Sequence, residues 1–439
     1  MDHRKPIGLL FIVAEAIVLT GLYVAALARY NALGHYLLYY AKGLFVYIAV
    51  YVIILAVVTK AYDGYEMGTY RLREIAFSQI LSVTLVNLIA YFQISLIAKQ
   101  FLRIDYLIFT TVVQYIFILI WTNISGRIYH SVYKPGRTVL IYGGDYPDAL
   151  AAKAEQSPYG FNLAAFVREG EAAARLELGD FDGFEGIMTC GASPEFGVYI
   201  NQFCFARNMQ LYIVPGISDV ILHNTRQTGL SDTPLLVCRN EALTFGQEII
   251  KRILDITGSI FILTVLSPFM AVTAAAIKLY DGGPVLYSQD RLTRDGKLFK
   301  VYKFRSMVDD AEKDGRARLA KKNDDRITPV GAFIRKIRFD EVPQFINVLI
   351  GDMSIVGPRP ERPEIARQYS LEMPEFGYRL KMKAGITGYA QVYGKYNTTP
   401  RDKLLMDIIY INSYSILLDI ELMLLTLKII FLPDKTEGI

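Results

Sequence analysis

The chain has 439 residues and a formal net charge of +4, and hydrophobic residues make up 52% of it. Its mean hydropathy of +0.27 is too high for an ordinary soluble protein, so part of the chain must lie in a bilayer. Residues 251–439 carry 29 Lys and Arg against 23 Asp and Glu, and such a basic region suits an anionic substrate or an anionic membrane surface.

The first 125 residues contain four apolar runs. These runs lie at 7–28, 37–59, 79–98 and 107–124. Each is close to the ~20 residues that a helix needs to cross the hydrocarbon core of a membrane. We therefore expect a bundle of four transmembrane helices at 1–125.

The charges beside these runs predict their orientation. Eight Lys and Arg lie in the N-terminus, in the loop 60–78 and just after the fourth run, whereas the two other loops hold three. The positive-inside rule then places the N-terminus and everything after residue 125 in the cytoplasm. Glu15 and Asn87 lie inside these runs, where polar groups are costly. We expect Glu15 to face the packed interior or a partner subunit, and a functional role is the alternative.

Residues 126–240 resemble a small α/β domain. Strand-like runs at 137–142, 162–167, 186–190 and 210–214 alternate with segments that suit helices. This alternation predicts a Rossmann-like α/β domain. Gly143 and Gly144 follow the first strand, but a complete G-x-G-x-x-G motif is missing, which favours a structural or regulatory domain over a nucleotide site.

A fifth apolar run follows, and we expect a re-entrant helix at 253–278. Ser267 and Pro268 interrupt it, and Lys and Arg flank both of its ends. Both ends should therefore face the cytoplasm. Proline removes a helical hydrogen bond and kinks the chain, while a serine hydroxyl can satisfy a freed carbonyl. The predicted helix breaks at this dipeptide and returns to the side from which it entered; a fifth, kinked span is the alternative.

Residues 251–439 contain no histidine and no cysteine. Chemistry in this region must therefore use carboxylates, hydroxyls, Lys or Arg, or a bound metal. Asp340 and Glu341 are the candidate pair, because Pro343 predicts a helix that starts near Asp340. The N-terminus of such a helix keeps a carboxylate ionised and can hold a phosphate. A helix-capping Asp beside a solvated Glu is the alternative on local sequence alone.

Four longer stretches place this pair in a wider context. They are Gly283-Pro-Val-Leu-Tyr-Ser-Gln-Asp-Arg, Phe299-Lys-Val-Tyr-Lys-Phe-Arg-Ser-Met, Phe339-Asp-Glu-Val-Pro-Gln-Phe-Ile-Asn-Val-Leu with Gly357-Pro-Arg-Pro-Glu, and Gly385-Ile-Thr-Gly-Tyr-Ala-Gln-Val-Tyr-Gly. In these motifs the segment 245–435 resembles the bacterial sugar transferase family, the monotopic polyprenyl-phosphate phosphoglycosyl transferases. The four spans and the α/β domain before it resemble the long-chain subgroup that initiates exopolysaccharide or capsule repeats.

The resemblance implies a covalent mechanism. Asp340 would attack the phosphorus attached to the sugar, and Glu341 would bind Mg²⁺. A nucleotide sugar, with UDP as the expected nucleotide, would donate sugar-1-phosphate to undecaprenyl phosphate and release the nucleoside monophosphate. The intermediate would be an Asp340 phosphosugar.

Several cations are the candidate substrate ligands. Arg359, held in Gly-Pro-Arg-Pro, suits bidentate binding of phosphate. Lys303 and Arg305 alternate along a strand-like segment and would face the same anionic substrate, unless one of them only pairs with an acid. Arg338 adds positive charge just before the acidic pair. For Arg291, the sequence favours neither a role in the site nor a role in the scaffold over the other.

The expected architecture is a four-helix transmembrane bundle at 1–125, a cytoplasmic Rossmann-like domain at 126–240 and an α+β catalytic domain at 245–439, anchored by the re-entrant helix. The family implies a multi-pass protein of the bacterial inner membrane with a cytoplasmic active site. Membrane lipid and a second copy of the chain, in a homodimer, are expected partners, and nucleic acid is not. Two rival functions remain: an inactive membrane scaffold for polysaccharide assembly, and a glycosyltransferase that releases a nucleoside diphosphate.

Overall fold

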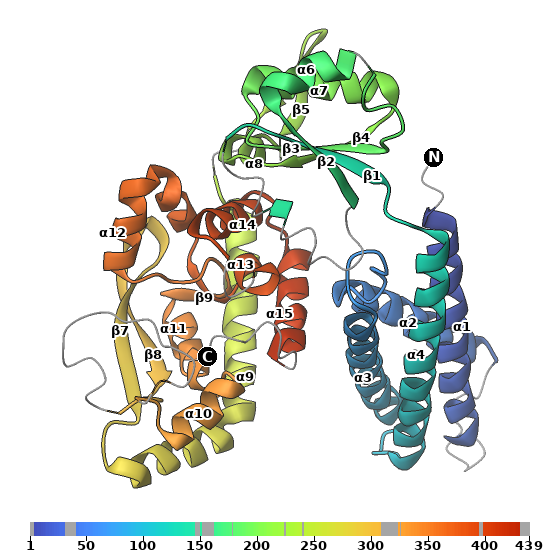
Figure 1. Cartoon of the computed structure of the whole chain (residues 1–439). Coiled ribbons are helices and arrows are strands. Elements are labelled where there is room, and N and C mark those ends of the chain that lie inside the picture. Colours follow the sequence, from blue (N-terminus) through green and yellow to red (C-terminus); the bar gives the residue numbers. More distant parts are fainter. Residues whose placement is uncertain are drawn as a thin grey trace. The chain divides into compact units, whose positions relative to one another are not determined.

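The computed structural model describes residues 4–30, 41–144, 150–151, 162–177, 179–223, 225–238, 241–308, 324, 326–394 and 398–430. The chain divides into two compact units, Met1–Pro215 and Gly216–Ile439. Figure 1 shows the elements of both units, and each unit is described by itself.

The first unit begins with four long apolar helices: α1 (Arg4–Tyr30), α2 (Ala41–Ala61), α3 (Leu72–Ile97) and α4 (Asp105–Val132). α1 packs against α2 and α4, and α3 packs against the same two helices. Within the described residues, these four helices and a fifth, at Phe245–Asp281, are long and apolar enough to cross a membrane. Their outer faces expose large apolar side chains such as Leu10 and Phe45, which suits contact with lipid. The chain is therefore a membrane protein.

Buried polar side chains link these helices to one another. Glu15 on α1 is only 2% exposed, and its carboxylate accepts a hydrogen bond from Gln79 Nε2 on α3 at 3.1 Å. Gln79 in turn accepts from the Thr122 hydroxyl on α4 at 2.8 Å. Deeper along α3, Asn87 Nδ2 donates to Gln114 Oε1 at 2.7 Å. The prediction that Glu15 faces the packed interior is confirmed, and interhelical hydrogen bonds of this kind help to hold membrane helices together.

A small α/β domain completes the first unit. Its elements are β1 (Arg137–Tyr142), β2 (Asn162–Arg168), α6 (Glu169–Glu177), β3 (Gly186–Cys190), α7 (Pro194–Arg207) and β4 (Gln210–Val214). All neighbouring strands are parallel, in the order β2-β1-β3-β4. The predicted α/β alternation around a parallel sheet is confirmed, and the order matches the flavodoxin-like variant of the doubly wound folds.

The glycine turn after β1 has a packing role in this sheet. Gly143 N donates to Cys190 O at 3.0 Å, and a Cβ added to Gly143 would lie 2.5 Å from Gly191 O. The ends of β1 and β3 therefore touch backbone to backbone, and only glycine permits this approach. This contact explains Gly143 without a bound nucleotide.

The second unit holds the remaining elements. They are α8 (Ile217–His223), β5 (Arg226–Leu230), β6 (Thr233–Val237), α9 (Phe245–Asp281), β7 (Leu286–Leu292), η2 (Arg294–Gly296), β8 (Leu298–Phe304), α10 (Pro329–Lys336), η3 (Phe339–Glu341), α11 (Gln344–Ile350), β9 (Met353–Val356), α12 (Pro363–Glu372), η4 (Pro374–Lys381), β10 (Ala384–Thr387), α13 (Tyr389–Tyr393), α14 (Pro400–Asn412) and α15 (Ile416–Ile430). β7 and β8 pair antiparallel, and β9 and β10 pair parallel. The main core gathers apolar side chains of β8, β9, α11, α14 and α15.

Ser267 and Pro268, where a break was predicted, lie inside helix α9, which is continuous from Phe245 to Asp281. Its N-terminus is fixed by a capping box between Thr244 and Gln247, and Pro268 lies inside the helix. The Ser267 hydroxyl donates to Thr264 O at 2.8 Å. This carbonyl is the one that a residue with an N–H at position 268 would have bonded, so serine replaces the hydrogen bond that proline removes. Figure 1 shows that the second half of α9 runs in a different direction from the first.

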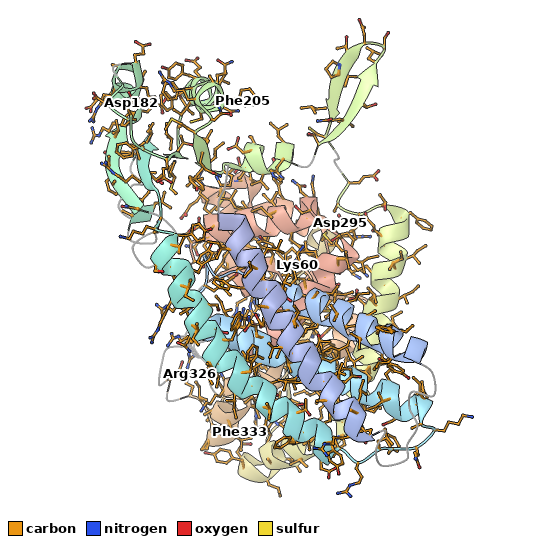
Figure 2. The ribbon with its side chains drawn as sticks, turned by 90° about the vertical axis from the view of Figure 1, so that its right-hand side faces the viewer. Lys60, Asp182, Phe205, Asp295, Arg326 and Phe333 are labelled. Atoms are coloured by element: carbon orange, nitrogen blue, oxygen red, sulfur yellow. The ribbon has the colours of Figure 1, made fainter. Side chains whose placement is uncertain are left out.

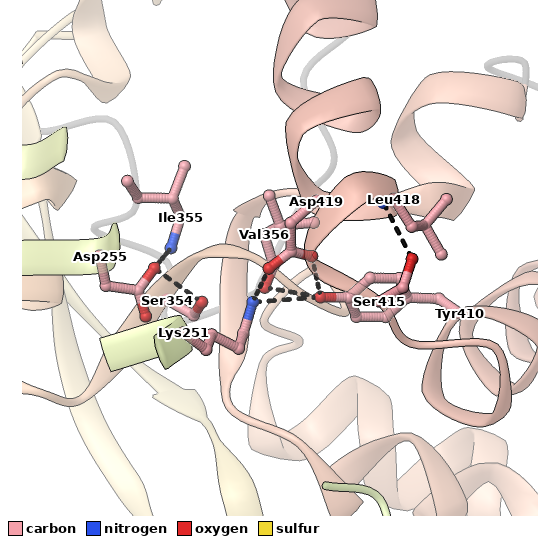
Figure 3. Close-up of polar contacts among 9 residues, drawn as sticks. All are labelled: Lys251, Asp255, Ser354, Ile355, Val356, Tyr410, Ser415, Leu418 and Asp419. Carbon is pink, nitrogen blue, oxygen red and sulfur yellow. Dashed lines mark hydrogen bonds and ion pairs between the residues drawn. The ribbon is translucent and has the colours of Figure 1, made fainter. Parts of the chain in front are cut away.

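A buried polar cluster joins the first half of α9 to the core (Figure 3). Lys251 Nζ lies 2.6 Å from Asp419 Oδ2 on α15, and both side chains are less than 10% exposed. The Tyr410 hydroxyl donates to the other oxygen of Asp419 at 2.7 Å. One turn further along α9, Asp255 accepts from the Ser354 hydroxyl at 3.0 Å. Buried charged side chains of α9 thus bind this apolar helix, below called the anchor helix, to the domain that follows it.

Candidate active site

The acidic pair lies in a tight turn between α10 and α11. Arg338 has a left-handed backbone, with φ of 54°, and turns the chain into the 3-10 helix η3, which contains Asp340 and Glu341. The predicted helix start near Asp340 is wrong, because α11 begins at Gln344. Pro343 has no N–H to donate to Phe339 O, which accepts instead from Val342 N at 3.2 Å. The α-helical bonding pattern can therefore begin only after the proline.

Contacts from three elements hold this turn in place. The Phe339 ring stacks on Phe304 of β8, with centroids 6.1 Å apart, and both rings belong to a cluster that includes Ile277 from the second half of α9. Asn347 on α11 is completely buried; its amide donates to Lys300 O at 2.7 Å and accepts from Tyr302 N at 3.0 Å. The acidic turn is thus fixed both to β8 and to the anchor helix.

The far end of α11 is held by the first half of α9. Arg252 donates to the carbonyls of Val348 at 2.6 Å and Leu349 at 2.8 Å. These are among the last carbonyls of α11, which have no partner within the helix. A cation at this end also interacts favourably with the helix dipole.

Glu341 is the centre of a compact charge cluster. Its Oε1 accepts from Lys303 Nζ at 2.6 Å and from an Arg359 guanidinium nitrogen at 3.1 Å, and its side chain is 13% exposed. Burial by itself would raise the pKa of Glu341, but the charges of Lys303, Arg359 and Arg338 outweigh it and hold this pKa well below its usual range. Glu341 is therefore an anion at any physiological pH.

Asp340 has a different environment although it is the next residue. In the part of the chain that the structure describes, its carboxylate takes part in no hydrogen bond or ion pair. Burial and the neighbouring Glu341 charge raise the pKa of Asp340 to about 6, against the opposing effect of Lys303, Arg335 and Arg359. Two adjacent carboxylates with divergent pKa values are typical of divided catalytic roles. Asp340 and Glu341 therefore differ in both their partners and their acidity.

The loop that carries Arg359 is formed where two sequence motifs meet. Gly357 N donates to Thr387 O at 2.8 Å, and Gly385 N donates to Pro358 O at 2.9 Å. A Cβ on Gly385 would lie 2.1 Å from Gly357 N. The Gly-Pro-Arg-Pro and Gly-Ile-Thr-Gly motifs are therefore two sides of one close backbone contact, which requires glycine.

Two further arginines hold the same loop through its carbonyls. Arg291 on β7 donates to Pro360 O at 3.2 Å, and Arg379 on η4 donates to Arg359 O at 2.9 Å. Arg379 is 4% exposed and also pairs with Asp407 at 2.8 Å. Burial, together with nearby Arg359, lowers the pKa of Arg291 to about 10. Arg359 is therefore presented to Glu341 by a rigid loop.

The structure brings together four of the predicted site residues in one pocket and leaves Asp340, Arg338 and Arg305 out of its lining. A small pocket is lined by Arg291, Val301, Lys303, Glu341, Gln344, Arg359 and Pro360. Arg291 combines the two roles between which the sequence could not decide, because it lines this pocket and also supports the loop. Arg338 contributes its backbone turn and its charge.

Arg305 does not line this pocket. It is 6% exposed and pairs with Asp281 at the end of α9. Of the two alternatives for this arginine, the structure shows the pair with an acid. The pair ties the start of the segment after β8 to the end of the anchor helix.

Three functional side chains escaped the sequence reasoning. Gln344 is the first residue of α11 and lines the pocket at Glu341; it stands inside the Phe339–Leu349 motif, which was the available signal. Asn347 and Arg379 act through backbone carbonyls of segments distant in the chain, so no local pattern marks them.

The residues present fit a magnesium ion. Among the described residues there is no group of three or more His, Cys, Asp or Glu side chains that could form a metal cage. Mg²⁺ does not need one, since proteins commonly bind it through one or two carboxylates together with substrate phosphates. The second oxygen of Glu341 is the donor that could hold it.

Comparison with known proteins agrees with this geometry. Residues 246–433 match the model of the bacterial sugar transferase family. An uncharacterized sugar transferase of Bacillus subtilis (strain 168), EpsL, is 37% identical over 189 residues, which are 43% of this chain and 91% of that protein. The chain belongs to the bacterial sugar transferase family. The acidic pair and the Arg359 loop both lie inside the matched region.

Other members of this family have names that state a reaction. The UDP-N-acetylgalactosamine-undecaprenyl-phosphate N-acetylgalactosaminephosphotransferase of Aeromonas hydrophila is 42% identical over 184 residues, which are 41% of this chain and 43% of that protein. The UDP-glucose:undecaprenyl-phosphate glucose-1-phosphate transferase of Escherichia coli (strain K12) is 37% identical over 219 residues, 49% of this chain and 47% of that protein. The matched segments thus span less than half of either of these two relatives.

Proposed function

We propose that this chain transfers sugar-1-phosphate from a nucleotide sugar, with UDP as the nucleotide, to undecaprenyl phosphate, as the first membrane step of exopolysaccharide or capsule synthesis. The observation that carries the proposal is the acidic pair. Among the described residues Asp340 has no hydrogen-bond or ion-pair partner, whereas Glu341 is paired with both Lys303 and Arg359. The names of the two transferases that match the chain support the same reaction.

The reaction would proceed in two displacements at one phosphorus. An Asp340 oxygen attacks the phosphorus that carries the sugar, and the bond from this phosphorus to the nucleoside monophosphate breaks. An oxygen of undecaprenyl phosphate then attacks the same phosphorus and displaces Asp340, which leaves as a free carboxylate. The products are a nucleoside monophosphate and undecaprenyl diphosphate sugar.

The surrounding cations would assist both displacements because they are already held where the phosphates bind. Arg359 and Lys303 stabilise the charge of the diphosphate, and their salt bridges to Glu341 hold them in place before the substrate binds. A Mg²⁺ ion held by Glu341 would offset further negative charge on the phosphates.

The nucleotide that is released tests the proposal. Purified protein in detergent, with undecaprenyl phosphate, Mg²⁺ and a panel of nucleotide sugars, is expected to release the nucleoside monophosphate. Release of the diphosphate would instead indicate a glycosyltransferase of the ordinary kind. Failure of every donor in the panel would favour the inactive scaffold.

The pKa of Asp340 predicts how activity varies with pH. Only the ionised carboxylate attacks, so kcat/KM should fall about tenfold per pH unit below the pKa of Asp340, which its burial and the Glu341 charge raise. Lys303→Met removes a charge that lowers this pKa, so the acid limb of the profile should move to higher pH. Glu341→Gln removes a charge that raises it, so the limb should move to lower pH. Profiles of kcat/KM for the three proteins test this, and opposite shifts would contradict the assignment.

We also propose that α9 enters the membrane from the cytoplasmic side and returns to it. Both halves of α9 expose large apolar side chains, for example Phe261 at 67% and Val272 at 69%, and Phe333 on the neighbouring α10 is 66% exposed (Figure 2). Ser267 and Pro268 lie between these halves. Such surfaces suit burial in the outer part of a bilayer.

Cysteine labelling of intact cells tests this topology. Lys300→Cys should resist a membrane-impermeant reagent, whereas Gln100→Cys, in a loop expected on the outside, should react. The three native cysteines are first replaced. Labelling of the cysteine at position 300 from outside would show that α9 crosses the membrane.

A further inference from the structure

A second, larger pocket lies beside the small pocket that Glu341 lines. The pocket at Glu341 has a volume of about 20 Å³, close to the space that one water molecule needs. The neighbouring cavity has a volume of about 410 Å³. Arg359 lines both of them, while Pro358 lines the larger and Pro360 the smaller. The Gly-Pro-Arg-Pro loop therefore separates the two pockets, with Arg359 at their shared rim.

The larger pocket has the character of a small-molecule site. Most of its lining residues are apolar, among them Leu298, Phe376 and Met382. Its polar lining residues are Thr293, Arg359, Glu361, Arg367, Ser370 and Arg379. Pockets that bind small molecules commonly measure about 300–1,000 Å³ and combine apolar walls with a few polar groups. The cavity meets both criteria.

The chemistry at Asp340 determines which part of a nucleotide sugar could lie here. The two phosphates lie between the sugar and the nucleoside, and the phosphorus next to the sugar must reach Asp340. Arg359 pairs with Glu341 and lines both pockets, so it is the cation placed to bind the other phosphate. With that phosphate at Arg359, the larger pocket is the space open to the nucleoside.

The composition of the walls supports the same orientation. A hexose carries hydroxyl groups on most of its carbons, and burying them without partners is costly. A flat base with a ribose needs fewer hydrogen bonds and gains more from apolar contact. On these grounds, and on the basis of the proposed function, we propose that the 410 Å³ pocket is the nucleoside subsite of the donor.

Filling the pocket tests the proposal. Ser370→Phe on α12 places a large side chain among its lining residues. Gly377→Leu on η4 does the same, since a Cβ at Gly377 meets no atom within 4 Å. Gln368→Phe is the matched control, because it is exposed on α12 and does not line the pocket. The melting temperature of each variant establishes that it is folded.

The measurements are the KM for the UDP-sugar and the inhibition constant of uridine 5′-monophosphate. Both filling variants should raise both constants at least about tenfold, with a much smaller change in kcat, and the control should match the wild type. A higher KM with unchanged inhibition by the monophosphate would assign the pocket to the sugar and overturn the proposal. Unchanged values of both constants would also overturn it.

Failure of the proposed function gives a different result. In that case the wild type would release no monophosphate from any nucleotide sugar. Calorimetric binding of uridine 5′-monophosphate alone then decides: binding that is lost in both filling variants but kept in Gln368→Phe sustains a nucleoside site, and absence of binding to the wild type overturns it.

Discussion

Asp340→Asn should lower the rate of monophosphate release about a thousandfold or more. An amide oxygen is a poor nucleophile, and removal of a covalent nucleophile commonly costs a factor of this size or larger. The substitution keeps the shape of the side chain, and Asp340 makes no hydrogen bond or ion pair among the described residues, so the fold should persist. Initial rates in detergent with a saturating donor provide the measurement.

Trapping of the intermediate makes the assignment specific. Wild-type protein incubated with a donor labelled in its sugar, in the absence of undecaprenyl phosphate, should retain label after denaturation, and the Asp340→Asn protein should retain none. Asp352→Asn is the matched control, because this aspartate lies in the turn after α11 and lines neither pocket. An Asp340→Asn protein that keeps a tenth of the activity would refute the nucleophile.

Asp419→Ala should have the largest effect on stability. It would leave the ammonium of Lys251 buried without its carboxylate, and breaking one partner of a buried pair costs about 3–5 kcal/mol. The free energy of unfolding in detergent, measured with a denaturant, should fall by that amount. The Tyr410 hydroxyl would also lose its acceptor at 2.7 Å.

Two comparisons separate the cost of leaving a buried charge unpaired from a nonspecific loss of stability. Lys251→Met combined with Asp419→Leu removes both charges and should recover most of the loss, since apolar replacements of a buried pair are often neutral. Glu248→Ala, on the same helix, breaks the pair with Arg294, in which both side chains are about 40% exposed. It should cost about 1 kcal/mol or less. Equal losses for Glu248→Ala and Asp419→Ala would contradict this account of the cluster.

These contacts also suggest how the anchor and the chemistry depend on each other. Lys251 and Asp255 fasten the first half of α9 to the core, and Arg252 between them holds the end of α11. Ile277, in the second half, packs in the same cluster as Phe339 of the acidic turn. The helix that we place in the membrane thus contacts both sides of the catalytic segment. A rigid connection of this kind would keep the active site at a fixed height above the lipid headgroups.

Features that depend on neighbouring residues were predictable from the sequence. The bend at Ser267-Pro268 follows from one missing N–H and one adjacent hydroxyl. The apolar helices follow from runs of about 20 residues. The parallel α/β domain follows from alternating patterns. The absence of His and Cys in residues 251–439 only narrowed the candidates for the chemistry, and the resemblance of the longer motifs pointed to the acidic pair.

Only the tertiary structure showed which charged side chains pair with one another, because the partners lie far apart in the chain. Lys303 and Arg305 have the spacing of one strand face, but β8 ends at Phe304, so Arg305 turns to Asp281 while Lys303 reaches Glu341. Arg379 holds the Arg359 loop through a backbone carbonyl. Sequence reveals the charge of such side chains but not the partner that neutralises it, because that partner is set by the packing of distant segments.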